Sequence, residues 1–246
     1  MQAMLLEICC GSVDDALAAQ AGGADRIELN SALFLGGLTP SVGAVIEVKR
    51  QVTIPAMVMI RPRVGGFHYS DAEFATMRAD AGQLVAHGAD GLVFGCLNDT
   101  GTIDRARTAM LVELAGGRPT VFHRAFDVVP DPFRALEELI DLGITRVLTS
   151  GQEESAYNGA ALIRKLIEAA RDRIEILPGG GIDSFNLHDV VQRSGTRQVH
   201  LALFKPHADH SCQHRPQVYF GGGLRPSEER IDVIDAGGVG QIRRML

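Results

Sequence analysis

Residues 142–151, LGITRVLTSG, place a glycine at the end of a helix-like segment and follow it with a short run of strand-forming residues. A glycine just past a helix commonly takes the left-handed conformation that ends the helix. Each occurrence of this pattern therefore predicts a helix end, a left-handed cap and a strand. The pattern occurs three more times, as AGGADRIELN (21–30), HGADGLVFG (87–95) and SGTRQVHLAL (194–203).

Four further apolar runs lie between these copies and have the composition of buried strands. They are LLEICC (5–10), IPAMVMIR (54–61), TVFHR (120–124) and IEILPGG (174–180). Segments with helical spacing alternate with the eight strands and cover 12–22, 39–52, 71–87, 104–115, 132–141, 156–170 and 184–194. We expect Ser12, Thr39, Asp71 and Ser184 to cap the N-termini of four of these helices.

Strands that alternate with helices predict a parallel sheet. Eight such units in 246 residues match the count and size of a single (β/α)8 barrel, also called a TIM barrel, which would occupy residues 1–246 as one domain. A doubly wound open sheet would instead favour a glycine-rich phosphate turn after the first strand. That turn, CCGSVDD, contains one glycine, and the last helix of the predicted barrel, at 238–246, is short.

The composition is that of an ordinary globular protein, with 46% hydrophobic residues and a formal net charge of −6. Without a basic surface, nucleic acid is an unexpected partner. The N-terminus, MQAMLLEICCG, has neither the basic region of a signal peptide nor the length of a membrane span. We therefore expect a cytoplasmic protein with no membrane partner, whose four cysteines are thiols. The sequence is compatible with a homo-oligomer.

Charged residues recur on the predicted strands and just after them. In a barrel the ligand site lies at the C-terminal ends of the strands, and alternate residues face the interior. The register therefore directs seven candidate catalytic residues toward one mouth. The same residues individually have structural interpretations, in which the glutamates form buried ion pairs and the histidine near strand five is a core residue. The seven are Glu7, Glu28, Arg61, Arg63, His123, Asp127 and His200.

Three consecutive glycines, Gly179, Gly180 and Gly181, follow the seventh strand. Barrels often bind phosphate at this place through backbone N–H groups. A tight turn that needs positive φ explains the same glycines without any ligand. Both interpretations remain open from the sequence.

The segment 205–216, KPHADHSCQHRP, is rich in potential metal ligands and follows the eighth strand. Its thiol and imidazoles suit copper or zinc, and Cys9 at the end of the first strand is a candidate second thiolate. The alternatives are a loop that closes over a small-molecule site, or a polar surface loop without a specific role. The predicted metal ligands are Cys9, His207, His210, Cys212 and His214.

Seven motifs, in chain order, make this sequence resemble the CutC family of copper homeostasis proteins: LEIC, GGADRIEL, GGLTPS, IRPR, FHRAFD, RVLTSG and GGGI, within 6–182. The resemblance implies a TIM barrel and a cytosolic protein linked to copper tolerance, with Cu(I) bound by cysteines, but it implies no defined reaction. Cys9 matches a cysteine of the family, whereas Asn30 stands where a second cysteine is common. Two further departures are RPRVGGF (61–67), which lacks an Asp, and Ala202 in place of a Ser.

Two functional hypotheses follow. The first is a copper homeostasis protein that binds Cu(I), with zinc as another candidate ion. The second is a barrel enzyme, a lyase, isomerase or hydrolase, acting on a small anionic or phosphorylated metabolite. In the enzyme, Arg61 and Arg63 would bind the anion, Glu7 or Glu28 would act as base, and His123 as acid or electrophile.

Overall fold

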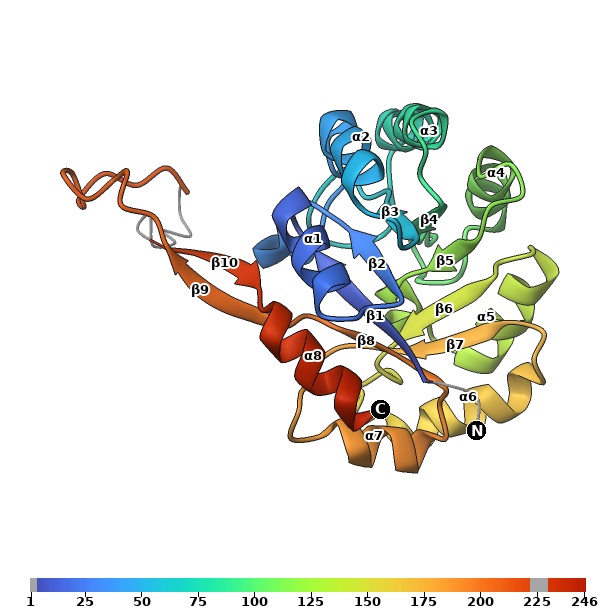
Figure 1. Ribbon diagram of the computed structural model, residues 1–246. Coiled ribbons are helices and arrows are strands. Elements are labelled where there is room, and N and C mark those ends of the chain that lie inside the picture. Colours follow the sequence, from blue (N-terminus) through green and yellow to red (C-terminus); the bar gives the residue numbers. More distant parts are fainter. Residues whose placement is uncertain (1–3, 222–229) are drawn as a thin grey trace.

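The computed structural model describes residues 4–221 and 230–246, and its main feature is a ring of eight parallel strands (Figure 1). Neighbouring strands follow chain order from β1 to β7, and β8 pairs with β1. A single bridge between Gly179 and His200 joins β7 to β8, so the ring is nearly closed. The strands are β1 (Leu5–Cys10), β2 (Arg26–Leu29), β3 (Ala56–Met59), β4 (Gly91–Phe94), β5 (Thr120–Phe122), β6 (Arg146–Thr149), β7 (Glu175–Pro178) and β8 (Gln198–Leu201).

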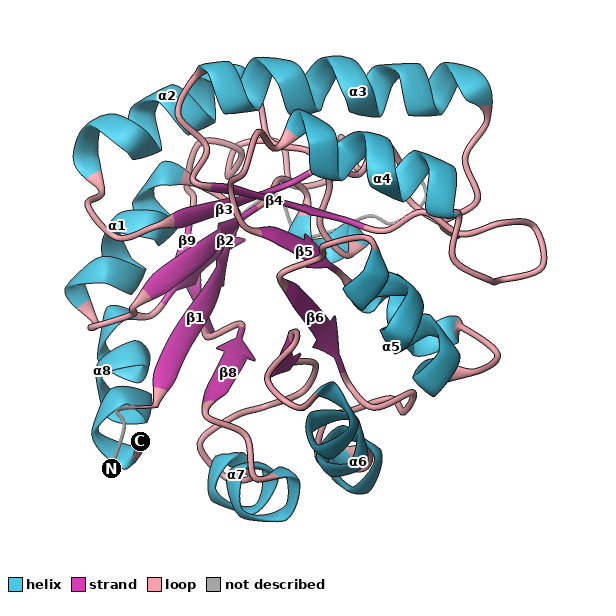
Figure 2. Ribbon diagram, turned by 90° about the vertical axis from the view of Figure 1, so that its right-hand side faces the viewer, coloured by secondary structure: helices cyan, strands magenta, loops and turns pink. Residues whose placement is uncertain are grey.

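Helices surround this ring on the outside (Figure 2). They are α1 (Val13–Ala21), α2 (Val42–Gln51), α3 (Asp71–Ala86), α4 (Arg105–Leu114), α5 (Pro132–Asp141), α6 (Ala160–Ala170), α7 (Leu187–Ser194) and α8 (Ala236–Met245). The predicted (β/α)8 barrel is confirmed, including the short final helix. No helix in the described part of the chain combines the length and the apolar character needed to cross a membrane.

The repeated glycines act as predicted at the helix ends. Gly23, Gly88, Gly143 and Gly195 have φ values of 92°, 98°, 76° and 71°. Each lies one or two residues past a helix and directly before the turn into the next strand. An L-residue is strained at such φ values. The sequence repeat therefore marks the αβ turns of the barrel.

Helix starts differ from the prediction at three places. Ser12 caps α1 as expected, but Ser41 rather than Thr39 caps α2. Thr39 Oγ1 instead accepts a hydrogen bond from the backbone N–H of Arg61 at 2.9 Å. Ser70 caps α3 through a capping box with Glu73, one residue before the predicted cap. α7 begins three residues after the predicted cap, Ser184, because Asp183 holds the backbone N–H groups of the two residues before α7 in a turn.

The barrel interior divides into an apolar part and a charged part. The apolar part lies on β3 to β7 and consists of Met57, Met59, Val93, Val121, Leu148 and Leu177. Strands β1, β2 and β8 contribute buried Glu7, Arg26, Glu28 and His200 instead, and β6 adds buried Arg146 at its start. Because a buried charge is costly unless it is paired, the charged part requires partners, and these partners organise the mouth.

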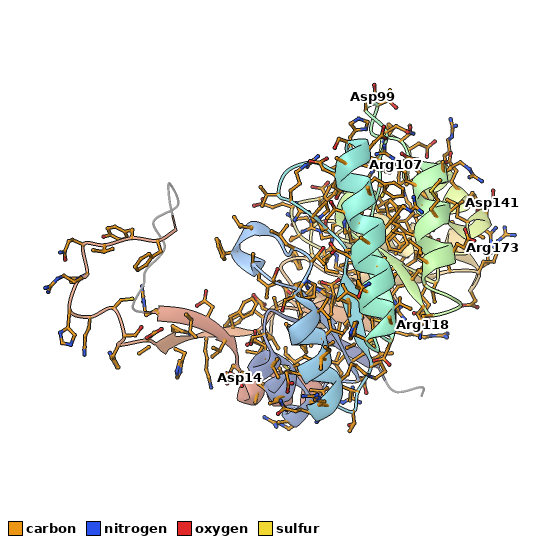
Figure 3. The ribbon with its side chains drawn as sticks, turned by 90° about the horizontal axis from the view of Figure 1, so that it is seen from above. Asp14, Asp99, Arg107, Arg118, Asp141 and Arg173 are labelled. Carbon is orange, nitrogen blue, oxygen red and sulfur yellow. The ribbon has the colours of Figure 1, made fainter. Side chains whose placement is uncertain are left out.

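A β-hairpin extends from the barrel after β8 (Figures 1 and 3). It pairs β9 (Phe204–Ala208) with β10 (Arg230–Ile234) in antiparallel fashion. We call this hairpin and the described residues 209–221 beyond it the arm. The histidine-rich segment 205–216 therefore belongs to an exposed arm that leads away from the strand ends, rather than to a loop folded over them.

Candidate functional site

A cavity of about 570 Å³ opens at the C-terminal ends of the strands. Eight of the predicted site residues line it: Cys9, Glu28, Arg61, His123, Asp127, Gly180, Gly181 and His200. Apart from Glu7, six predicted site residues do not line it: Arg63, Gly179, His207, His210, Cys212 and His214. Glu7 lies beneath the cavity, where it contacts His200.

The floor of the cavity is a buried chain of charged groups. The Arg26 guanidinium donates to one carboxylate oxygen of Glu7, and His200 Nδ1 donates to the other at 2.7 Å. Burial alone would raise the pKa of Glu7, but Arg26 and His200 lower it well below its ordinary value. Glu7 is therefore a carboxylate, and it leaves His200 Nε2 without a hydrogen-bond partner among the described residues.

Cys9, Glu28 and His200 form a compact group above this floor. One ligand atom from each lies within 4.8 Å of the others, and no other set of three or more His, Cys, Asp or Glu side chains in residues 4–221 and 230–246 meets this condition. Burial, with the nearby charge of Glu28, raises the pKa of the Cys9 thiol well above 9.0. Burial also raises the pKa of Glu28, and although burial lowers the pKa of His200, Glu28 and Glu7 raise it overall. The surroundings therefore shift the pKa values of all three groups upward.

Asn30 lines the cavity, although it was not among the predicted site residues. Its side-chain Nδ2 lies 2.8 Å from Glu28 Oε2 and 3.4 Å from Cys9 Sγ. The sequence could have identified Asn30 as a cavity residue, because it follows Glu28 by two residues and alternate residues of an extended chain face the same side. Asn30 therefore orients the two neighbouring ligand groups.

His123 is neutral and carries a buried N–H donor in the cavity wall. Burial and the adjacent charge of Arg61 lower its pKa to about 3. Its Nδ1 accepts a hydrogen bond from the backbone N–H of Ala125 at 3.1 Å, which places the proton on Nε2. Nε2 is buried without a partner in the described structure. A neutral imidazole N–H of this kind can polarise a carbonyl oxygen.

Arg61 and Arg63 have different surroundings, although both were predicted to bind an anion. Arg61 is 8% exposed and lines the cavity, and its guanidinium donates to backbone carbonyls. Arg63 lies outside the cavity, where it makes a two-point ion pair with Glu73 and also donates to the carbonyl of His68. The structure thus separates the two arginines.

Asp127 organises the wall formed by the loop after β6. Its carboxylate accepts hydrogen bonds from Thr149, from the backbone and side chain of Ser150, and from the backbone of Gln152. Arg124 Nε also donates to it at 2.8 Å. With its lone pairs used in this way, Asp127 fixes the loop. Its predicted catalytic role stays a prediction.

Arg124 is a second cavity residue that the sequence interpretation missed, although it lies within the FHRAFD motif. Its Nη1 atom has no hydrogen-bond partner among the described residues. A Cβ built on Gly180 would lie 3.1 Å from the Arg124 guanidinium carbon. The guanidinium therefore packs against the Gly180 backbone at a distance that leaves little room for a side chain there. Gly180 and Gly181 have φ values of 99° and 67°, which satisfies the tight-turn interpretation. Phosphate binding by Gly179, Gly180 and Gly181 stays a prediction.

Comparisons with known proteins agree in pointing to one family. The model of the CutC family matches residues 4–204, which ends where the arm begins. A CutC family protein of Treponema denticola is 52% identical over 233 residues, 95% of each chain. A human copper homeostasis protein cutC homolog is 46% identical over 231 residues, 94% of this chain and 85% of that one.

A solved structure from Streptococcus agalactiae, described as a CutC copper homeostasis protein, superposes with a TM-score of 0.76 at 36% identity. The match covers 80% of this chain and 97% of that one. Fold, sequence and the mouth motifs therefore lead to the same conclusion: this chain belongs to the CutC family.

Proposed function

We propose that this CutC-family protein binds one Cu(I) ion through Cys9 and His200, with Glu28 as a further ligand. The observation that carries the proposal is the approach of these three ligand atoms to within 4.8 Å of one another. Copper is favoured because human and mouse relatives are named copper homeostasis proteins. We place the protein in the cytoplasm, where reducing conditions keep Cys9 available as a thiol.

The electrostatics of the group favour a cation. Glu28 and Glu7 raise the pKa of His200, so negative charge next to this imidazole favours a cation there, and a metal ion would take the place of the proton on the buried Cys9 thiol. Thiolate and imidazole are the ligands that Cu(I) prefers, whereas the carboxylate also suits Zn²⁺. Glu7 supports either ion, because a carboxylate hydrogen-bonded to the distal nitrogen of a ligating histidine fixes the ring.

Anaerobic competition for Cu(I) against a calibrated chelator tests this site. Replacing Cys9 with serine should weaken Cu(I) binding about 10- to 100-fold, because the soft ligand is lost. A variant of the arm with His207→Ala, His210→Ala, Cys212→Ser and His214→Ala should bind as the native protein does, since those residues are absent from the cavity. The reverse pattern would assign copper to the arm, and tighter binding of Zn²⁺ than of Cu(I) at Cys9 would reject copper as the cargo.

A second candidate function is acid–base chemistry on a small metabolite in the same cavity. The observation that favours it is a pair of buried atoms without partners in the described structure, Glu28 Oε1 and His123 Nε2. Glu28, with its raised pKa, would exchange a proton with substrate carbon, and neutral His123 would donate a hydrogen bond to the oxygen that gains charge. This division of roles matches the charged mouth predicted for a barrel enzyme.

Pyruvate in D₂O is a simple probe of this chemistry, because its methyl protons lie next to a carbonyl group. Proton NMR should show protein-dependent exchange of these protons for deuterium. Glu28→Gln should slow the exchange about 100-fold, whereas Glu47→Gln, an exposed change on α2, should not. Equal rates in the native protein and Glu28→Gln would exclude Glu28 as the base.

A further inference from the structure

Arg61 is a buried cation without a carboxylate partner among the described residues. The other arginines of the barrel interior have one: Arg26 pairs with Glu7, and Arg146 pairs with Glu175. Arg61 Nη1 donates instead to the carbonyls of the loop after β2, at 3.0–3.4 Å, and Nη2 donates to the Gly65 carbonyl at 3.0 Å. Carbonyl oxygens satisfy hydrogen bonds but supply no counter-charge, so the cavity wall carries a net positive charge.

Two N–H groups of the Arg61 guanidinium are not used by these carbonyls, although the Tyr69 side chain also interacts with Arg61. Its Nε atom is buried without a partner in the described structure, and Nη2 uses one of its two N–H groups. Nε and Nη2 lie along one edge of the planar guanidinium. A carboxylate accepts two parallel hydrogen bonds from such an edge, which is the strong, geometrically specific form of this contact.

His123 adds a third donor close to this edge. The Phe67 ring lies between the two residues, 5.4 Å from the Arg61 guanidinium carbon and 4.9 Å from the His123 ring centre. Both flanking side chains are more than nine-tenths buried and both line the cavity. The unpartnered His123 Nε2–H therefore shares one wall with the unpartnered Arg61 donors.

We propose that this wall binds a small organic carboxylate that has an oxygen atom on the adjacent carbon, as 2-oxo acids and 2-hydroxy acids do. The carboxylate would accept hydrogen bonds from Arg61, and the adjacent oxygen would accept one from His123 Nε2. The Phe67 ring would contact the carbon skeleton. None of these three residues is a proposed metal ligand, although all of them line the same cavity as the metal ligands. The site gives the substrate class for the acid–base candidate, and only its catalytic role rests on that candidate.

Isothermal titration of metal-free protein with pyruvate tests the proposal. The native protein should bind pyruvate at one site and bind acetate, which lacks the second oxygen, at least about tenfold more weakly. Arg61→Lys and His123→Asn should each weaken pyruvate binding at least about tenfold. Asparagine is a good N-cap, so His123→Asn keeps an acceptor for the Ala125 N–H. If Arg61→Lys fails to fold, the binding of pyruvate by His123→Asn still tests the site.

A surface variant and a competing anion separate this site from non-specific binding. The exposed α5 variant Arg134→Gln should bind pyruvate as the native protein does, because Arg134 lies on the outside of the barrel and pairs with Glu138. Unchanged binding in His123→Asn, or tighter binding of inorganic phosphate than of pyruvate, would overturn the carboxylate site. Pyruvate binding without deuterium exchange would keep the site and remove only the acid–base function.

Discussion

Replacing Arg26 with methionine should lower the free energy of unfolding by about 3–5 kcal/mol, because it leaves the Glu7 carboxylate buried without its main counter-charge. Arg26 is 5% exposed and Glu7 is 1% exposed, so water cannot take the place of the guanidinium. Methionine keeps much of the side-chain length, which limits the effect of a cavity. Urea unfolding, with the slope checked for constancy, measures the change.

Two further variants identify charge as the cause. Arg50→Met removes the arginine of an exposed pair with Glu47 and should change stability little, since surface pairs contribute little. Arg26→Met combined with Glu7→Leu should be more stable than Arg26→Met alone, because no unpaired charge remains. A double variant as unstable as the single one would mean that packing of the Arg26 side chain, rather than its charge, supports the barrel.

The fold could be predicted because its signals are local. A glycine just past each helix, as at Gly143, requires only that the helix end in a left-handed turn, and the four copies fix the spacing of the barrel units. Helix starts are harder because Ser and Thr have several uses. Thr39 could cap a helix, but its hydroxyl accepts a hydrogen bond from the Arg61 backbone, two residues past the end of β3, which the sequence around Thr39 cannot show.

The cavity residues on strands could be predicted from alternation along the chain. Glu28 faces the interior on β2, and Cys9 faces it by the same rule on β1. Asn30 lies one residue past β2 but keeps the alternation, because its backbone N–H still donates to the Cys10 carbonyl. Arg63 obeys the same alternation from Arg61, but β3 has ended at Met59, so Arg63 follows the loop to Glu73 instead. Alternation thus holds for one or two residues past a strand, as at Asn30 and Arg61, but not as far as Arg63.

The arm could not be predicted because its composition suits several structures. The segment 205–216 reads as a polar loop, and the residues that pair with its start, Arg230–Ile234, lie more than twenty residues later. Register between such distant segments depends on long-range pairing rather than on local pattern. The proposed ligands His207, His210, Cys212 and His214 were consequently placed near Cys9 in the prediction, whereas the structure places them on the arm.

Acidification should weaken Cu(I) binding by about 10²- to 10⁴-fold between pH 8 and pH 6, because the metal must displace protons from its ligands. The Cys9 thiol, with its pKa well above 9.0, releases one proton on binding at every pH in this range. That release alone gives about a tenfold loss of affinity for each unit of pH. Below the raised pKa of His200 a second proton must leave, and the loss becomes about a hundredfold per unit.

Single-residue variants, measured in the same chelator competition, distinguish the proton released by Cys9 from the proton released by His200. Cys9→Ser should flatten the pH dependence above the pKa of His200, since no thiol proton remains to be released. Glu7→Gln removes the carboxylate that accepts a hydrogen bond from His200 Nδ1, so the pKa of His200 should fall. The hundredfold loss of Cu(I) affinity per pH unit should then begin at a lower pH. An affinity that stayed constant from pH 8 to pH 6 would show that copper is bound without the Cys9 thiolate. The paired Glu7 and Arg26 would then serve the stability of the barrel rather than its metal chemistry.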